Sequence, residues 1–158
     1  MLQSIFGLSI QKQNCLQQIV EEYLTGRKFL FEKTADESLF ILPLSGENGA
    51  FKMYFIFDNK KGIMQIHSHC PIDIKEHQKL RLAELITRLN NNLLLGCFIL
   101  NFEEGEIIYK TVHLCIDKSL NLKTMDILFN TNAQTMDDFL PAISAVNSGY
   151  SEPCLAAQ

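Results

Sequence analysis

The sequence predicts an α+β fold in which an antiparallel sheet carries helices packed on one face. Apolar residues recur at helical spacing in three segments, and stretches rich in aromatic and β-branched residues lie between them. With 158 residues, 47% of them hydrophobic, the chain is large enough to bury one core. The predicted order is helix, three or four strands, helix, two strands, helix. We expect one domain over residues 1–149 and a loose C-terminal tail over residues 150–158.

The first helix is predicted from about Ser9 to Thr25. Its apolar positions follow the spacing that places one stripe of a helix against a core. They are Leu16, Ile19, Val20, Tyr23 and Leu24.

Short strands are predicted next, separated by turn residues. Their ranges are Lys28–Lys33, Ser38–Leu44, Ala50–Phe57 and Ile63–Ser68. The third has the clearest alternation, with one face directed into the core. That face carries Phe51, Met53, Phe55 and Phe57. The loop from Asp58 to Gly62 is typical of a hairpin, and Pro43 restricts its strand to an edge or to the end of a ladder.

A second helix is predicted from about Lys75 to Asn91. Its core stripe consists of Leu82, Leu85, Ile86, Leu89 and Leu93. Further apolar residues on the helix and at its exit point elsewhere, namely Leu80, Ala83, Leu94 and Leu95. A helix that is apolar beyond one stripe usually packs on two surfaces, so we expect a homodimer.

Two strands, Cys97–Phe102 and Glu106–Ile116, follow this helix. The second is apolar on both alternating faces, so its pattern does not show which face is buried. The C-terminal third has a helical stripe that the polar Asn132 interrupts. It consists of Met125, Leu128, Phe129, Met136, Phe139, Leu140, Ile143 and Val146. Pro141 leaves open whether this stripe is one kinked helix or two short helices.

Charge and cysteine content favour a soluble cytoplasmic protein. The formal net charge of −4 disfavours nucleic-acid binding, and no apolar run is long enough to span a membrane. Residues Met1–Ile10 lack the basic start of a signal peptide. The 5 cysteines are odd in number and form no C-x-x-C pair, unlike a secreted disulfide framework.

The stretch from Leu82 to Thr111 resembles the central signature of the bacterial YbjN family, and the segment from Asp138 to Ile143 resembles its last helix. The matching positions in the signature are Asn90, Gly96, Phe98, Gly105, Tyr109 and Thr111. The resemblance implies the fold of type III secretion chaperones, which are small acidic homodimers that bind extended segments of other proteins. It also implies a regulator of sensory transduction. Asn90 is expected to bridge the helix end to the loop before Gly96, the alternative being contact with a ligand.

The nearest approach to a metal cluster is the set His67, His69, Cys70 and His77. Alternation places Cys70 on the strand face opposite the two strand histidines, and the spacing is unlike that of zinc signatures, so no metal or other cofactor is predicted. The pair His113 and Cys115 lacks a third orienting group.

The carboxylates Glu103, Glu104 and Glu106 flank a turn and are expected to be solvated. No glycine spacing matches a phosphate-binding loop. The sequence therefore predicts no catalytic residue and no enzyme.

The leading hypothesis is a non-enzymatic interaction protein, either chaperone-like or regulatory, that binds another protein as a homodimer. The alternative is a small-molecule or metal sensor with a site between sheet and helices, to which His67, His69 and His77 would contribute.

Overall fold

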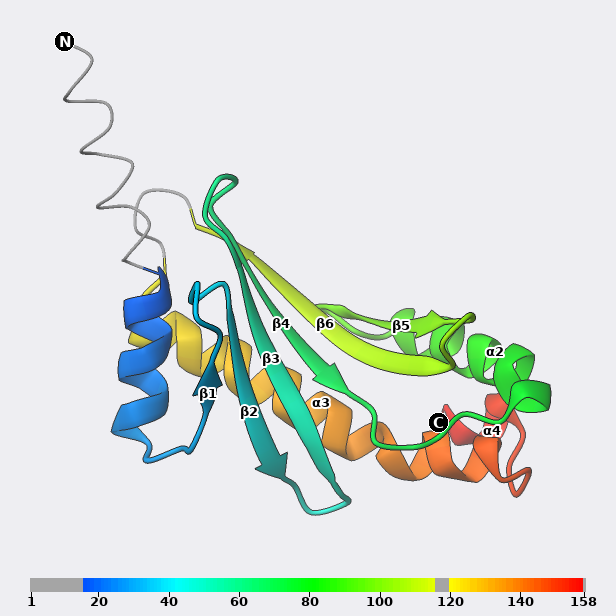
Figure 1. The fold of residues 1–158 in the computed structure, drawn as a ribbon. Coiled ribbons are helices and arrows are strands. Elements are labelled where there is room, and N and C mark those ends of the chain that lie inside the picture. The colour runs from blue at the N-terminus through cyan, green and yellow to red at the C-terminus, as the bar shows by residue number, and fades with distance from the viewer. Residues whose placement is uncertain (1–15, 116–119, 158) are drawn as a thin grey trace, which may run out of the picture.

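The computed structural model describes residues 16–115 and 120–157. In this part of the chain the strands form one antiparallel sheet in the order β1-β2-β3-β4-β6-β5. The strands are β1 (Glu32–Lys33), β2 (Leu39–Ser45), β3 (Ala50–Asp58), β4 (Ile63–His69), β5 (Cys97–Asn101) and β6 (Glu106–Leu114). Figure 1 shows the long C-terminal helix running beneath the sheet, on the same side as the other helices. The predicted α+β class is confirmed.

The helices also follow the predicted order. The described part of the N-terminal helix covers residues 16–26, and its predicted start at Ser9 lies outside the described residues. The others are η1 (Glu76–Gln78), α2 (Lys79–Asn90), α3 (Leu122–Asn147) and α4 (Pro153–Ala156). Helix α3 runs through Pro141 without a break, which decides between the two alternatives left open by the sequence.

The expectation of a loose tail after Gly149 is wrong for the residues described there. Pro153 is buried, and α4 packs against α2 and α3. The guanidinium of Arg81 donates to the carbonyl of Ser151 at 2.9 Å and lies 2.9 Å from the Glu152 carboxylate. The segment is too short and too weakly periodic to predict as a helix, and it is ordered by docking on α2.

The core lies between the sheet and the helices. Strand β3 directs Phe51, Met53, Phe55 and Phe57 into it, and all are buried, as the alternation predicted. The register pairs Asp58 with Ile63, so the hairpin around the predicted turn is also confirmed.

The structure decides the orientation of β6. Ile107, Tyr109 and Thr111 are buried against the helices, while Ile108 and Lys110 lie on the opposite face. The opposite face of β6 also carries apolar residues, Ile108, Val112 and Leu114, although no helix of the described chain covers them. This is why alternation alone could not assign the strand.

Asn132 lies in the core with no exposed surface and links α3 to two strands. Its oxygen accepts from the Ser68 hydroxyl at 2.6 Å. Its amide nitrogen donates to the Ile66 carbonyl at 3.0 Å and to the Thr111 hydroxyl at 3.1 Å. The polar residue that interrupts the apolar stripe therefore fixes the position of α3 under β4 and β6.

Another two side chains of α3 hold loops. The carboxylate of Asp137 accepts from the backbone N–H groups of Glu47 at 2.8 Å and of Asn48 at 3.0 Å. The Asn147 amide accepts from the Lys75 N–H at 2.9 Å and donates to the Asp73 carbonyl at 2.9 Å. These bonds tie the β2–β3 turn and the approach to α2 to the same helix.

Candidate protein-interaction surface

The face of the sheet opposite the helices, here called the open face, is not covered by any helix of the described chain. Figure 1 shows this side of the sheet bare over the described strands. From the strand register, the side chains on this face are Glu32, Leu39, Ile41, Pro43, Ser45, Ala50, Lys52, Tyr54, Ile56, Asp58, Ile63, Gln65, His67, His69, Cys97, Ile99, Asn101, Glu106, Ile108, Lys110, Val112 and Leu114. Leucine, isoleucine and valine recur on every one of these strands except β1, although polar side chains usually prevail on a solvated sheet face.

The apolar residues of the open face are most exposed on β5 and β6. Ile99 is 39% exposed, Val112 52% and Leu114 53%. Ile108 pairs with Ile99 in the register and continues the same strip. We call Ile99, Ile108, Val112 and Leu114 the aliphatic strip. Exposed aliphatic surface of this kind, here on both sides of Lys110, often marks a contact site.

Polar side chains form a second group along β4. His69 Nδ1 lies 2.5 Å from the Glu106 carboxylate, and its ring packs on that of Tyr54 with centroids 4.3 Å apart. The ring of His67 lies 6.4 Å from that of His69 and bonds Gln65 Oε1 at 3.1 Å. Burial, with the nearby ammonium of Lys110, lowers the pKa of His67 to about 4, so this imidazole is neutral at pH 7.

Two lysines complete the open face. Lys52 lies on β3 and Lys110 on β6, and neither forms an ion pair with another residue of the described part of the chain. Two carboxylates of this face are engaged, Glu106 by His69 and Asp58 by Lys61 at 3.5 Å. Glu32 adds a third carboxylate at the β1 end, so the face carries charges of both signs.

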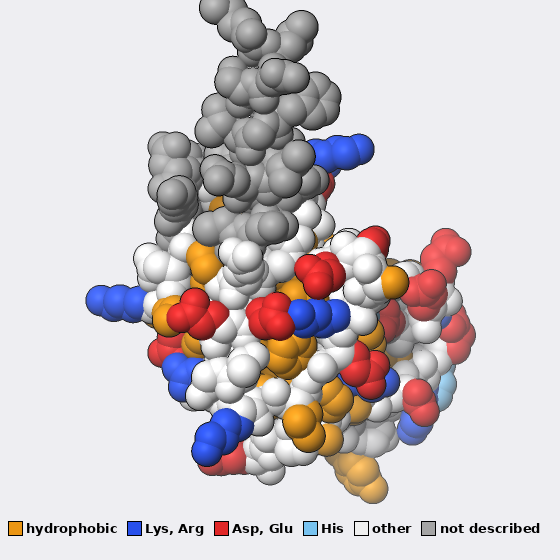
Figure 2. Space-filling view, turned by 60° about the vertical axis from the view of Figure 1, so that its left-hand side comes forward, with side chains coloured by type: hydrophobic (Ala, Val, Ile, Leu, Met, Phe, Trp, Pro, Cys, Tyr) orange, Lys and Arg blue, Asp and Glu red, His pale blue; other side chains and the backbone are white. Residues whose placement is uncertain are grey.

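Ion pairs neutralise charges at the end of the molecule formed by the N-terminal helix and β1. Figure 2 shows charged side chains of both signs interspersed on this side. Lys33 pairs with Glu21 at 2.5 Å, and Arg27 pairs with Asp126. No field of a single sign develops where the charges neutralise each other locally.

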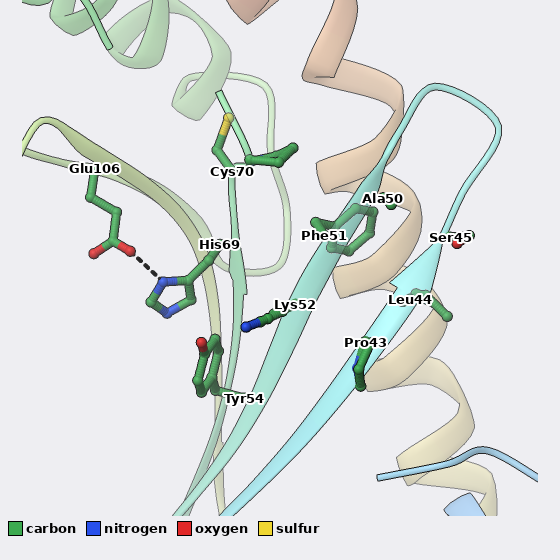
Figure 3. Close-up of a pocket in the computed structure, with 11 residues that line it drawn as sticks. Pro43, Leu44, Ser45, Ala50, Phe51, Lys52, Tyr54, His69, Cys70 and Glu106 are labelled. Carbon is green, nitrogen blue, oxygen red and sulfur yellow. Dashed lines mark hydrogen bonds and ion pairs between the residues drawn. The ribbon is translucent and has the colours of Figure 1, made fainter. Parts of the chain in front are cut away.

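A hollow of about 460 Å³ adjoins the open face at the ends of β2, β3 and β4. Figure 3 shows the His69–Glu106 pair on one side of it, with Tyr54 and Lys52 nearby and Pro43 on the β2 side. The hollow touches the predicted residues His69 and Cys70. Burial raises the pKa of the Cys70 thiol to about 11, so the thiol stays protonated and weakly nucleophilic at neutral pH.

The predicted histidine cluster is only partly assembled. His67 and His69 share the open face, which points away from the helices, so the expected site between sheet and helices does not include them. His77 lies in η1 and is exposed. Among the described residues, no three histidine, cysteine or carboxylate side chains converge in a way that could hold a metal ion.

The motif positions meet where α2, β5 and β6 join. The Asn90 amide donates to the Phe98 carbonyl at 3.0 Å, and its oxygen accepts from the Phe98 N–H at 2.8 Å. The Tyr109 hydroxyl donates to the carbonyl of Leu95 and its ring packs on Phe98, with centroids 4.8 Å apart. Thr111 belongs to the Asn132 network.

Two glycines in the motif have a backbone role. Gly96 has a φ of 79°, and a Cβ there would lie 2.5 Å from the Lys110 carbonyl oxygen. Gly105 has a φ of 65° in the β5–β6 turn, away from the rest of the group. Both conformations favour glycine over residues with a side chain.

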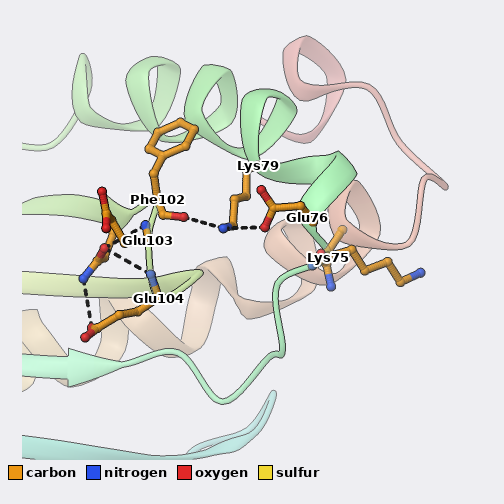
Figure 4. Close-up of polar contacts among 8 residues, drawn as sticks. Lys75, Glu76, Lys79, Phe102, Glu103 and Glu104 are labelled. Carbon is orange, nitrogen blue, oxygen red and sulfur yellow. Dashed lines mark hydrogen bonds and ion pairs between the residues drawn. The ribbon is translucent and has the colours of Figure 1, made fainter.

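The same helix closes the edge of the sheet at β5. Asn90 covers the backbone of Phe98 at one end of the strand, and the ammonium of Lys79 donates to the Phe102 carbonyl at the other. Figure 4 shows Lys79 reaching from α2 to Phe102, with the Glu76 carboxylate beside it at 2.6 Å. An unpaired strand edge invites association, and here side chains of α2 take the place of a neighbouring strand.

The other edge of the sheet is partly free. Strand β1 pairs only with Phe40 and Ile41 of β2. The carbonyl of Ser38 accepts from Phe57 on the β3 side, so by alternation Pro43 and Ser45 direct their backbone groups away from β3. Pro43 has no N–H on that side, in agreement with the predicted edge position.

Helix α2 and the loop that follows it also expose apolar side chains. Leu80 is 78% exposed and Leu94, just after the helix, is 98% exposed. Both residues lie outside the core, as their place off the stripe predicted.

No helix in the described ranges is long and apolar enough to cross a membrane.

These features define an α+β protein with one covered and one open sheet face, and the same fold occurs in solved structures. The crystal structure of YbjN from E. coli, titled a putative transcription regulator, superposes with a TM-score of 0.60 at 10% identity, covering 80% of this chain and 87% of that one. A chain in the crystal structure of the ExsC–ExsE complex gives a TM-score of 0.54 at 11% identity, covering 82% of this chain and 93% of that one. The expected likeness to type III secretion chaperones is confirmed at the level of fold.

The family model described as "Putative bacterial sensory transduction regulator", named YbjN, matches residues 17–145. The chain belongs to the YbjN family, as its central motif indicated. No curated protein matches the chain.

Proposed function

We propose that this chain is a non-enzymatic, regulatory or chaperone-like module that binds another protein as a homodimer. The open face carries this proposal, because it exposes the aliphatic side chains of Ile99, Val112 and Leu114 to solvent. The family is described as a regulator of sensory transduction, and one structural relative is titled as a complex of two proteins. Both descriptions support a protein partner.

The β2 edge supports binding of an extended segment. Beyond the end of β1, the outward backbone groups of Pro43 and Ser45 are available for strand addition. The hollow beside the open face and a second hollow beside α3 flank this edge, and Leu44 and Ser45 line both. Alternate side chains of an added strand would enter one hollow and then the other.

The outer surface of α2 supports the homodimer. Leu80 near the start of α2 and Leu94 beyond its end are exposed apolar side chains, which a two-fold axis would place against the same surface of a second copy. We expect a mass of about twice 18.0 kDa in light scattering at micromolar concentration. The double variant Leu80→Glu/Leu94→Glu should be monomeric, whereas Lys60→Glu in the β3–β4 turn should remain dimeric. A monomeric wild-type protein would remove the dimer from the proposal.

Site-specific photo-cross-linking tests the partner. A photoreactive residue in place of Ser45 should yield a discrete adduct with a second protein in cells that express the chain naturally, and one in place of Lys61 should not. Adducts that match at both positions, or none at any surface position, would argue against a specific client. The free thiols of Cys70, Cys97 and Cys154 support a reducing cytoplasm as the compartment.

A small-molecule sensor is the second candidate, favoured by the convergence of Tyr54, His69 and Lys52 around one hollow. A metabolite that binds the folded state there should raise the melting temperature in a saturable way. Lys52→Ala should abolish that shift while leaving the melting temperature of the free protein unchanged.

A further inference from the structure

The inner strands of the open face offer side chains but no backbone hydrogen-bonding groups. Strands β3, β4 and β6 each pair with a neighbour on both sides, so their N–H and C=O groups are used within the sheet. A segment buried on this face must satisfy its own backbone groups, and an α-helix does so internally. An extended client on the β2 edge can instead bond its backbone groups to those of the edge strand.

The unpaired lysines of the open face indicate which charge a partner should carry there. Lys110 lies within the aliphatic strip, between Ile108 and Val112 along β6, and Lys52 lies two strands away on β3. Neither is paired within the described chain, and on this face Glu106 is engaged by His69 and Asp58 by Lys61. Burying a lysine without a counter-ion is costly, so a partner that covers Lys110 must supply an acidic group.

We propose that the open face docks an amphipathic helix of another protein, with its aliphatic stripe on Ile99, Ile108, Val112 and Leu114 and an acidic side chain on Lys110. The inference rests on the proposed protein-binding function and adds a second surface to it. Such a helix would cover the bare side of the sheet and give it helices on both faces. The pairing with Lys110 fixes the sign of the charge that the helix must carry next to its stripe.

Synthetic peptides test the chemistry directly. The probe is an amphipathic peptide of about 18 residues, long enough for a stable helix, with a leucine and isoleucine stripe flanked by glutamates. Its two controls are the same peptide with lysines in place of glutamates and a scrambled peptide of the original composition. Binding is measured by calorimetry with the full chain. The acidic peptide should bind at least about tenfold more tightly than either control.

Variants of the chain then locate the site. Lys110→Glu should weaken binding of the acidic peptide and strengthen binding of the basic one. Val112→Asp should weaken binding of both, while Lys60→Glu leaves the affinities unchanged. Unchanged circular dichroism of each variant shows that it folds. Equal affinity for the three peptides, no binding of the acidic one, or indifference to Lys110→Glu would overturn the proposal.

Cross-linking separates this inference from the general function. Photoreactive residues are placed at Val112 and at Ser45 in cells. Adducts at both positions, with the acidic helix of the client mapped to Val112, support the proposal. Adducts at Ser45 alone overturn the open-face helix and leave the client-binding function intact, and adducts at neither position overturn both.

Discussion

The side-chain amide of Asn90 pairs with the backbone of Phe98 as a neighbouring strand would. It accepts from the Phe98 N–H at 2.8 Å and donates to the Phe98 carbonyl at 3.0 Å. Strand β5 lies at the end of the sheet order, so these backbone groups have no strand partner on that side. One residue thus ends α2 and closes the sheet edge.

Asn90→Ala should lower the free energy of unfolding by roughly 1 to 3 kcal/mol, because two buried backbone groups lose their partner. It should also increase aggregation through the uncovered edge. Urea denaturation and light scattering measure the two effects. Asn91→Ala, at the exposed neighbouring position, is the matched control, and an equal loss there would show that the loss at Asn90 does not come from its hydrogen bonds to Phe98.

Phe55→Ala should cost about 3 to 5 kcal/mol of unfolding free energy, since it removes a fully buried ring. Lys52→Ala, on the exposed side of the same strand, should change it by less than about 0.5 kcal/mol. Chemical denaturation decides. A loss below about 1 kcal/mol for Phe55→Ala would contradict the assignment of the β3 faces.

Asn132→Ala should destabilise the fold by roughly 1 to 3 kcal/mol for each buried group that it leaves without a partner. The Ser68 hydroxyl and the Thr111 hydroxyl are the groups concerned. Ser68→Ala should cost less in the Asn132→Ala background than in the wild type, because the shared hydrogen bond is already gone. Additive losses in this double-mutant cycle would mean that the network is not coupled.

His67 should make stability fall as the solution is acidified. Its pKa is about 4 when folded and 6.5 as the ordinary value, so below pH 6.5 the unfolded chain binds a proton that the folded chain refuses. The stabilisation present above pH 6.5 is therefore lost between about pH 6.5 and 4, by roughly 1 to 3 kcal/mol.

The variant His67→Gln isolates this contribution. Urea denaturation of both proteins at pH 7.5 and 4.5 should show a smaller loss for the variant, since other titrating groups, including His113, are common to both. An equal loss would show that His67 titrates normally in the folded protein.

The sequence determined the elements and much of the core. Period-two alternation in β3 and helical spacing in α2 depend on local geometry, so each identifies its buried face without reference to distant residues. The edge position of Pro43 likewise follows from its missing N–H. The motif around Gly96 and Phe98 indicated the family, because its residues are close in sequence and carry its backbone constraints.

Only the tertiary structure decided which side of an element is buried when both sides are apolar, and which distant partner a polar residue contacts. The pattern of strand β6 allows either face to be buried. In the structure α3 covers one face, which leaves the aliphatic strip on the other. Asn132 appeared as an interruption of a stripe, since its partner Ser68 lies 64 residues away. The proposed role of Lys110 in binding depends on its position beside Ile99 and Val112 in the folded sheet. Such relations arise when strands distant in sequence are brought into register, and no local pattern encodes them.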